Sequence, residues 1–407
     1  MSDREKMEFW GYERPDGTVG VRNTLAVFGA GSTAHHMAVR IAEEVKGAVP
    51  LLFDEALLRL REDRERARRT IVGVGHNPNL AAVLLVGFGG GHMDPVDLAQ
   101  EMAGTSKPVE VVTVAECKGF SQAVDKGLST ARQLMSKISR AQRQPFPIGH
   151  LTLGVKCGGS AGNSGLLGNV VVGRAVDTLV ANGGSTIFSE TPEVIGAEHL
   201  LAKRAVNDRV ARRVREVVER MEARIRRAGE DIRGSQPTDG NLKGGLTTLE
   251  EKSLGALAKT GTSPLSGVLE YGERPSGRGL FFMDGPAGPI NIMVGEAAAG
   301  AQIFIYSLGG GLYSSFRNLP GWGIGGFPIG PVLSVVSNAS HPRDEEEEQF
   351  FDIHCQGVLD GLESIDHVAN RFLQELLAVA SGKLSKAEIS LPHYWVPLES
   401  YHTGPIL

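Results

Sequence analysis

Two polar stretches organise the chain: KCGGSAGNSG at residues 156–165 and ETPEVIGAE at residues 190–198. Each follows a short apolar run, at residues 150–155 and 186–188, that is typical of a buried strand. Open parallel α/β sheets bind ligands at the carboxyl ends of their strands, and both stretches lie where strands should end. Plain turns rarely gather a thiol, an ammonium, hydroxyls and three carboxylates in this way. The sequence therefore predicts a functional site at one edge of a parallel sheet.

Before these stretches, apolar runs alternate with helical patterns. Strands are predicted at residues 24–28, 80–86 and 109–114, with helices at 34–46 and 122–140. Such alternation indicates a parallel, doubly wound sheet. The predicted fold class is therefore α/β, with two Rossmann-like units and mainly parallel sheets.

A polar stretch with two prolines, RAQRQPFP at residues 140–147, marks the predicted domain boundary. The first α/β domain is expected at residues 1–145. The second is expected at residues 146–407 and carries both polar stretches.

The second domain is predicted to hold one long charged helix at residues 202–228. Its later strands are expected at residues 279–283, 302–306 and 332–336. A glycine-rich segment at residues 308–331 has no regular period, and a loop of that length is usually functional or mobile. The charge run at residues 344–348 is expected to be a solvated helix start.

The composition favours a cytoplasmic enzyme. A net charge of −5 argues against a nucleic-acid partner, which usually needs a clustered basic face. Three cysteines, Cys117, Cys157 and Cys355, make no disulfide framework and fit a reducing compartment. The polar first ten residues do not resemble a signal peptide, and no apolar run reaches membrane-spanning length. The expected partner is a small molecule, with no nucleic acid and no membrane.

The carboxylates and the ammonium of the two stretches suit proton abstraction next to a carboxylate. That chemistry needs a base, and a positive group near the resulting enediolate. The catalytic candidates are Glu190 and Glu193 as bases, Lys156 as the positive group and Cys157. In the alternative interpretation, the carboxylates only cap a helix that begins at the same place.

Further side chains are predicted to bind substrate. They are Arg22, Asn23, His92, Ser160, Asn163, Ser164 and Lys252. Arg22 and Asn23 would bind an anion at the start of a strand or, equally, form a salt bridge that holds the leading loop. Lys252 is a candidate carboxylate contact, and its alternative is a surface position on a helix.

Residues 29–33, GAGST, follow the first strand in the manner of a dinucleotide fingerprint. The third glycine is missing, and no acidic residue follows at the required distance. We therefore expect no NAD or NADP cofactor.

Four long motifs together resemble one known family. They are GYERPDGTVGVRN at 11–23, KCGGSAGNSG at 156–165, ANGGSTIFSETPEVIGAEHLL at 181–201 and KGGLTTLEEKSLG at 243–255. With these motifs in this order, the chain is similar to the altronate/galactarate dehydratase family, which includes the large subunit of sulfolactate sulfo-lyase. The resemblance implies two Rossmann-like units and a metal-assisted elimination of a group β to a carboxylate.

The chain departs from this resemblance at several positions. The places of family cysteines correspond to Thr33, Gly90 and Ala256, and Ala161 stands where an aspartate usually follows KCGGS. Only Cys157 of the recurrent thiols is present. Because an iron–sulfur cluster needs about four thiolate ligands, no cluster is expected.

A divalent ion on oxygen ligands is expected instead, with Mg, Mn or Fe(II) as candidates. Its predicted ligands are Glu190, Glu193 and Glu198.

The expected function is a lyase of the hydro-lyase type. It would eliminate water from a small hydroxy or sugar acid through an enediolate and give a 2-keto acid. One alternative is an epimerase or isomerase that uses the same enediolate. Another is a non-catalytic paralogue that binds a sugar acid or supports an active subunit. We expect a homo-oligomer. The small amino-terminal domain of the full-length dehydratases is expected to be absent, and a small separate subunit could replace that domain.

Overall fold

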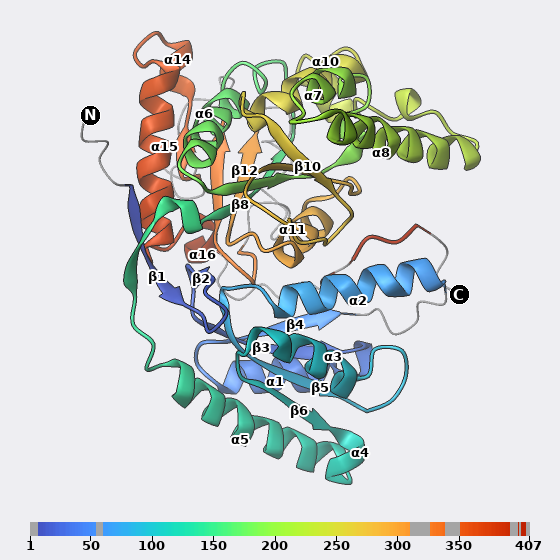
Figure 1. Cartoon of the computed structure of the whole chain (residues 1–407), viewed down its shortest axis with the longest axis vertical. Helices are drawn as coiled ribbons and strands as arrows, with labels where there is room; N and C mark the ends of the chain where they lie inside the picture. Colours follow the sequence, from blue (N-terminus) through green and yellow to red (C-terminus); the bar gives the residue numbers. More distant parts are fainter. Residues whose placement is uncertain are drawn as a thin grey trace.

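The computed structural model describes residues 7–53, 60–309, 326–337, 351–390, 398 and 400–403. Its framework consists of a four-stranded parallel sheet, a seven-stranded parallel sheet and a small three-stranded antiparallel sheet (Figure 1). This architecture confirms the predicted α/β fold with mainly parallel sheets.

The first parallel sheet is covered by helices on both faces. Its strands, in spatial order, are β4 (Ala48–Phe53), β3 (Thr24–Ala30), β5 (Leu80–Gly87) and β6 (Val109–Thr113). Helices α1 (His35–Glu44) and α5 (Phe120–Ile138) pack on one face, and α2 (Arg61–Gly75) and α3 (Pro95–Met102) pack on the other. The short α4 (Val114–Cys117) leads from β6 into α5. Because both faces are covered, strand β5 is buried along its whole length.

The second parallel sheet has its first strand near the middle. Its spatial order is β10 (Leu265–Leu269), β11 (Gly279–Met283), β9 (Ser185–Phe188), β8 (Thr152–Gly158), β12 (Ile303–Leu308), β13 (Val332–Val336) and β14 (Ile353–His354). After β8, the next strands, β9, β10 and β11, lie on one side of β8, and the chain then crosses to β12 on the other side. The boundary between β8 and β12 is thus a topological switch point, where open α/β sheets form ligand crevices.

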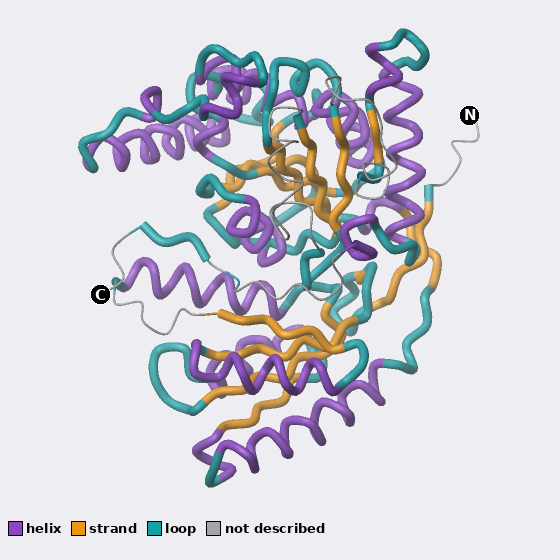
Figure 2. Tube along the Cα trace, turned by 180° about the vertical axis from the view of Figure 1, so that it is seen from behind, coloured by secondary structure: helices purple, strands orange, loops and turns teal. Residues whose placement is uncertain are grey.

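Helices also cover both faces of this sheet (Figure 2). Helix α6 (Gly168–Ala181) packs against α15 (Ile365–Ala380) in the core on one face. Helix α11 (Pro289–Ala298) lies on the other face and contacts β8. Further short helices in the described part of the chain include α9 (Asp239–Lys243), α10 (Leu249–Leu257), α14 (Gln356–Leu359) and α16 (Lys386–Ser390).

The two units are joined by chain crossings and by a shared core. Strand β1 (Glu8–Glu13) pairs antiparallel with β2 (Val19–Gly20) and with β7 (Gln144–Pro147), which follows the first unit. Helices α2 and α11 pack together between the units, where Ile71 and Val74 share one apolar cluster with Ala297. The predicted boundary at residues 140–147 therefore coincides with a strand that ties the amino terminus to the linker.

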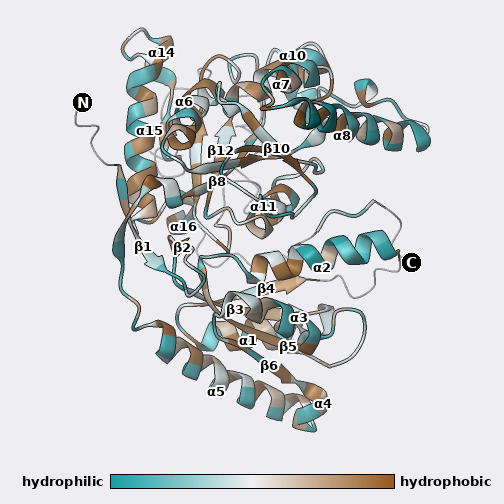
Figure 3. Cartoon of the chain, in the orientation of Figure 1, coloured by the Kyte–Doolittle hydropathy of each residue, from teal (hydrophilic) through white to brown (hydrophobic). Residues whose placement is uncertain are grey.

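The long charged helix predicted at residues 202–228 is wrong in its extent. The chain forms two helices instead, α7 (Glu198–Lys203) and α8 (Asp208–Arg227). The break is caused by Asn207, whose side chain accepts a hydrogen bond from the backbone N–H of Val210 and caps α8. Helix α8 buries one apolar stripe and is hydrophilic on its other side (Figure 3).

Most of the predicted loop at 308–331 and the charge run at 344–348 lie outside the described residues. Within the described part of the chain, no helix is long and apolar enough to cross a membrane.

Candidate active site

The two polar stretches meet at the carboxyl ends of β8 and β9. Lys156 and Cys157 are successive residues near the end of β8, so their side chains leave opposite faces of the sheet. Glu190 precedes the short 3₁₀ turn that follows β9, and Glu193 is the last residue of that turn. All four side chains are buried. The sequence prediction that these residues converge on one sheet edge is therefore the arrangement found.

A buried ion pair joins the two stretches. The Nζ of Lys156 lies 2.7 Å from Oε2 of Glu190, and it also donates to the backbone oxygen of Cys157 at 2.7 Å. On the adjoining strand β12, the ring of Tyr306 lies 5.8 Å from the same ammonium. Lys156 is thereby held between a carboxylate and an aromatic face.

A second buried group forms around Glu193. Its Oε2 accepts hydrogen bonds from the Cys157 thiol at 3.1 Å and from Nζ of Lys259 at 3.0 Å. The Lys259 ammonium also lies 3.1 Å from the Cys157 sulfur. The ammonium of Lys252 stands 3.9 Å from the other oxygen of Glu193 and donates to Gln236 at 2.7 Å. Glu193 is thus surrounded by donors.

The two carboxylates differ in their electrostatics. Burial, together with the charge of Glu193, raises the pKa of Glu190 above its ordinary value, against the opposing effect of Lys156. Burial also acts to raise the pKa of Glu193, but Lys259, Lys156 and Lys252 outweigh it and lower that pKa to about 2. Glu193 therefore stays ionised, whereas Glu190 is the carboxylate suited to take up a proton.

The thiol is held in its neutral form. Burial, with the charge of Glu193 added, raises the pKa of Cys157 to about 11. At neutral pH it is a hydrogen-bond donor and not a thiolate nucleophile.

The capping interpretation does not describe Glu190. Glu190 is the residue before the 3₁₀ turn, and its side chain makes no capping hydrogen bond. Its backbone has φ +79°, a left-handed conformation that costs a non-glycine residue energy. The surrounding contacts hold Glu190 in this conformation and aim its carboxylate at Lys156.

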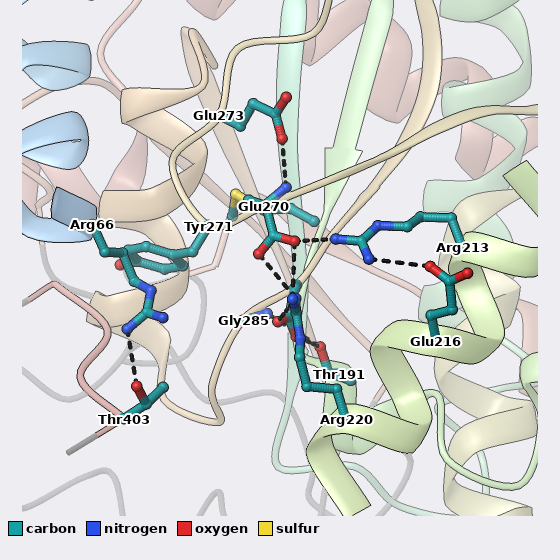
Figure 4. A network of polar contacts seen from close by, with 12 residues as sticks. Arg66, Thr191, Arg213, Glu216, Arg220, Glu270, Tyr271, Glu273, Gly285 and Thr403 are labelled. Atoms are coloured by element: carbon teal, nitrogen blue, oxygen red, sulfur yellow. Dashed lines mark hydrogen bonds and ion pairs between the residues drawn. The ribbon is translucent and has the colours of Figure 1, made fainter. Parts of the chain in front are cut away.

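A polar network fixes the turn that carries Glu190 (Figure 4). The hydroxyl of Thr191 donates to Asp284 at 2.6 Å, and the backbone N–H of Thr191 donates to Gly285. Arg220, from helix α8, binds Asp284 at 2.5 Å and reaches both oxygens of Glu270. Helix α8 is therefore tied through β11 to the turn after β9.

A cavity of about 330 Å³ opens beside this charged cluster. The glycine-rich turn after β8 forms one wall, and helix α10 forms the other. Its polar lining residues include Ser160, Ser164, Asn169, Glu251 and Lys252. Because Lys252 both lines the cavity and approaches Glu193, the cavity adjoins the buried cluster. Its volume is in the range of a small-ligand site.

Two departures from the family resemblance meet in this cavity. Ala161 and Ala256, where the resemblance implies an aspartate and a cysteine, both line its wall. The other two such positions lie in the first unit, where Gly90 is exposed. This wall therefore presents methyl groups in place of a carboxylate and a thiol.

The described donor set does not fit a divalent ion. Among the residues that the structure describes, no three His, Cys, Asp or Glu side chains gather in a way that could hold a metal. Lys156 and Lys259 lie directly against Glu190 and Glu193. The third predicted ligand, Glu198, accepts a hydrogen bond from the backbone N–H of Gly196 at 2.6 Å. The metal therefore stays a prediction, and no chemical step is derived through it.

Three predicted binding residues lie elsewhere. Arg22 forms an ion pair with Glu388 at 2.7 Å, so its alternative assignment as a structural salt bridge describes its contacts. Asn23 donates to the backbone oxygen of Ile138 and accepts from Arg14. His92 is exposed in the turn after β5 of the first unit. The sequence placed Arg22 and Asn23 at the start of one strand and His92 after the end of another, and both strands belong to the first sheet.

The other predicted binding residues are in or near the site. Ser164 accepts a hydrogen bond from the backbone N–H of Ala161 at 2.9 Å and so shapes the glycine-rich turn. Asn163 donates to the backbone oxygen of Ser337 at 3.3 Å. Its Oδ1 is buried and has no hydrogen-bond partner among the described residues.

Sequence reasoning missed Lys259, Tyr306 and Glu296. Lys259 follows the KGGLTTLEEKSLG motif, and a lysine between an apolar helix end and Thr260-Gly261 was the available signal. Tyr306 lies inside an apolar strand, where an aromatic residue is ordinary. Glu296 lies in the otherwise apolar helix α11, and a lone acid in such a helix was the clue.

The chain matches sequence models of two family domains. Residues 11–139 match the D-galactarate dehydratase/altronate hydrolase second domain. Residues 148–403 match the D-galactarate/altronate dehydratase C-terminal domain.

Three characterised relatives align over most of the chain. The (2R)-sulfolactate sulfo-lyase subunit beta of Chromohalobacter salexigens is 34% identical over 93% of this chain and 94% of its own length. Galactarate dehydratase (L-threo-forming) of Escherichia coli is 31% identical over 93% of this chain and 74% of its own. Altronate dehydratase of Bacillus subtilis is 28% identical over 94% of this chain and 76% of its own. These relatives are carbon–oxygen or carbon–sulfur lyases, in agreement with the predicted lyase, and the chain belongs to the D-galactarate/altronate dehydratase family.

Proposed function

We propose that this protein is a lyase that removes a proton α to a carboxylate and expels a leaving group from the β carbon of a small hydroxy acid. The observation that supports this most directly is the buried pair of Glu190 and Lys156. A carboxylate of raised pKa is a suitable base, and an ammonium beside it suits the negative charge that develops.

The charge balance of the cluster favours an anionic ligand. Three ammonium groups, those of Lys156, Lys252 and Lys259, face the two carboxylates of Glu190 and Glu193. One positive charge is therefore left over in a buried setting, where an unbalanced charge is costly. The carboxylate of a hydroxy acid would balance it.

Each charged residue then has a distinct role. Glu190 takes the α-proton, and the ammonium groups of Lys156 and Lys259 stabilise the enediolate. Glu193, which stays ionised, holds Lys259 and the Cys157 thiol in place. Lys252, on the wall of the cavity, meets the substrate carboxylate.

Unsatisfied acceptors near the cavity fit a polyhydroxy ligand. The buried Oδ1 atoms of Asn163 and Asn169 have no hydrogen-bond partner among the described residues, and neither has the hydroxyl of Ser307. Buried acceptors without a partner are costly, and substrate hydroxyls would satisfy them.

Two leaving groups are consistent with this site. Water is the leaving group in a dehydration, as the names of the galactarate and altronate dehydratases indicate for those proteins. Sulfite is the second candidate, because the relative at 34% identity is a sulfo-lyase subunit that aligns over 94% of its length. Both eliminations begin with the same proton abstraction.

The test is a turnover assay with galactarate, altronate and (2R)-sulfolactate as probes. The protein is purified with any chain that accompanies it. We expect a 2-keto acid from one sugar acid, or sulfite from sulfolactate. Exchange of the α-proton with solvent without loss of a leaving group would point to the epimerase alternative. Absence of both exchange and product would contradict the proposal.

We also propose that the chain works with a second, smaller polypeptide. One relative is named as a subunit beta, and the dehydratase relatives extend beyond the region that aligns with this chain. The subunit composition of the native complex, measured by mass spectrometry, checks this. A homo-oligomer without any second chain would contradict it.

A further inference from the structure

Glu296 is a buried acid that the catalytic scheme above does not use. It lies in helix α11 under strand β8, and none of its surface is exposed. One carboxyl oxygen, Oε1, accepts a hydrogen bond from the backbone N–H of Val155 at 3.2 Å. Within the described residues, the other oxygen, Oε2, has no hydrogen-bond partner. A carboxyl group with one satisfied oxygen at full burial is costly and rarely kept for packing alone.

Strand β8 leaves room for this acid. A side-chain carbon on residue 154 would collide with Oε2 of Glu296 and press against the ring of Phe304, so the glycine makes room for the acid. Residues i and i+2 of a strand share one face, so Gly154 and Lys156 face the same side of β8. Glu296 therefore lies on the face from which the Lys156 side chain leaves, roughly 7 Å along the strand.

Lys156 has capacity for one more contact. An ammonium has three N–H donors. Two of them are accounted for, by Glu190 and by the backbone oxygen of Cys157. No third acceptor contacts Lys156 in the described part of the chain; only the ring of Tyr306 lies nearby, at 5.8 Å. An unsatisfied acid and an ammonium with a spare donor thus share one face of the sheet.

The charged groups around Glu296 come from three elements. They are Lys156 on β8, Glu190 after β9 and Lys259 in the turn after α10. Burial raises the pKa of Glu296 well above its ordinary value despite the two lysines. Helix α2 contributes Ile71 and Val74 to the apolar cluster that also holds Ala297 of α11, and Asn77 donates to the backbone oxygen of Ala297. The acid is therefore positioned to hold a proton at neutral pH.

We propose that Glu296 is a positioning residue that keeps Lys156 protonated during turnover, an inference that rests on the proposed lyase function. Glu190 takes the α-proton, and the leaving group departs with the electron pair of its bond to the β carbon. The leaving group takes a proton from the Lys156 ammonium, and Glu296 then gives a proton to Lys156. Glu190 then holds one proton more and Glu296 one fewer. Transfer of the extra proton from Glu190 to Glu296 restores both groups and balances the cycle.

The first experiment separates proton abstraction from departure of the leaving group. The variant Glu296→Gln keeps the size of the side chain but has no proton to give. We expect kcat for elimination to fall by about 10- to 100-fold, less than for loss of a direct general acid because Glu296 acts through Lys156, with KM changed less than about threefold. Exchange of the substrate α-deuterium should fall far less, because Glu190 is intact. Glu296→Asp, which retains an acid, should recover part of the rate.

Asp352→Asn is the matched control. Asp352 is a partly buried carboxyl whose pKa burial also raises, but its oxygens accept from Ser334 and from the backbone N–H of Lys386, neither of which belongs to the candidate site. Its loss should lower the melting temperature without changing kcat of the folded protein.

The second experiment does not depend on activity. The folded protein retains the Glu296 proton at a pH where the unfolded chain has lost it, so wild-type stability falls as pH rises above about 4.5. The melting temperature of Glu296→Gln should therefore exceed that of the wild type by a gap that widens between pH 5 and pH 9. A gap that does not change with pH would overturn the neutral-acid assignment.

The outcomes distinguish the two proposals. An inactive wild type would sink the proposed function, and this inference with it. An active wild type with an equally active Glu296→Gln would overturn the inference alone. A parallel fall in exchange and elimination would also overturn it, since a merely structural change slows both steps.

Discussion

The carboxyl ends of the two parallel sheets are both rich in glycine, but they present different chemistry. After β5, residues 88–92 are exposed, and three successive glycines, Gly89 to Gly91, have positive φ. The turn is closed by Asp94, which accepts from Gly90 and caps α3. After β8, the glycine-rich turn instead lies beside buried Lys156 and Cys157.

Two buried lysines, one in each unit, also differ in their surroundings. In the first unit, Lys107 donates to three backbone oxygens, those of Gly75, Asn77 and Leu80. In the second unit, Lys259 donates to the Cys157 sulfur and to Glu193. Burial lowers the pKa of Lys107 to about 7, and its contacts are neutral backbone oxygens, so this lysine ties backbone segments together. Lys259 lies among charged groups, and Cys157 and Glu193 raise its pKa against the effect of burial, so it stays positive.

The largest expected effect is on the base. Glu190→Gln preserves size and removes basicity, so turnover should fall by about 10²- to 10⁴-fold. The fold should persist because the amide can still accept from Lys156, but the melting temperature should fall, since the buried ammonium loses its counter-charge. Turnover and thermal melting on the same preparation check this. Full activity would mean that Glu190 is not the base, and the proposed difference between the two sheet edges would lose its support.

Exchanging each lysine for methionine tests the contrast directly. Lys107→Met leaves three buried carbonyl oxygens without a donor and should cost about 3 kcal/mol of stability, with turnover per folded molecule unchanged. Lys259→Met removes a positive group from the enediolate and should lower turnover by about 10²-fold. Denaturant unfolding and kinetics on both variants provide the comparison. Equal kinetic effects would show that the two lysines do not differ in role.

Acid titration of stability tests the charge on Glu193. Its folded pKa of about 2 lies below the ordinary value of 4.5, so its stabilising contribution is present above about pH 4.5 and is lost as pH falls towards 2. The shift corresponds to about 3 kcal/mol. The stability difference between wild type and Glu193→Gln should therefore shrink across this range. A difference independent of pH would contradict the assignment of Glu193 as a fixed anion.

The smallest effect is expected at the exposed turn of the first unit. His92→Ala should leave turnover unchanged and alter stability by less than about 0.5 kcal/mol, as for most surface substitutions. Kinetics with the active probe substrate checks this. A large loss of turnover would place the first sheet edge in the active site.

Much of the second site could be predicted from local sequence. The polar stretches after β8 and β9 identified Lys156, Cys157, Glu190 and Glu193, because parallel neighbouring strands end at one edge. Lys259 could not be paired with them in advance, since it lies 66 residues beyond Glu193. The same reasoning placed His92 in the turn after a strand of the first unit, and the structure has it there, in the sheet that does not carry the charged cluster.

The sequence alone determined the class of fold, the alternation of strands and helices, and the family, because these follow from apolar periodicity and from motifs that are contiguous in the chain. Tertiary packing determined which ammonium lies against which carboxylate. It placed Glu296 under Gly154 and paired Arg22 with Glu388, away from the charged cluster. It also held Glu190 in a left-handed backbone conformation. The physical reason is that charge, burial and pKa depend on neighbours brought together from distant parts of the chain, and no local pattern records those neighbours.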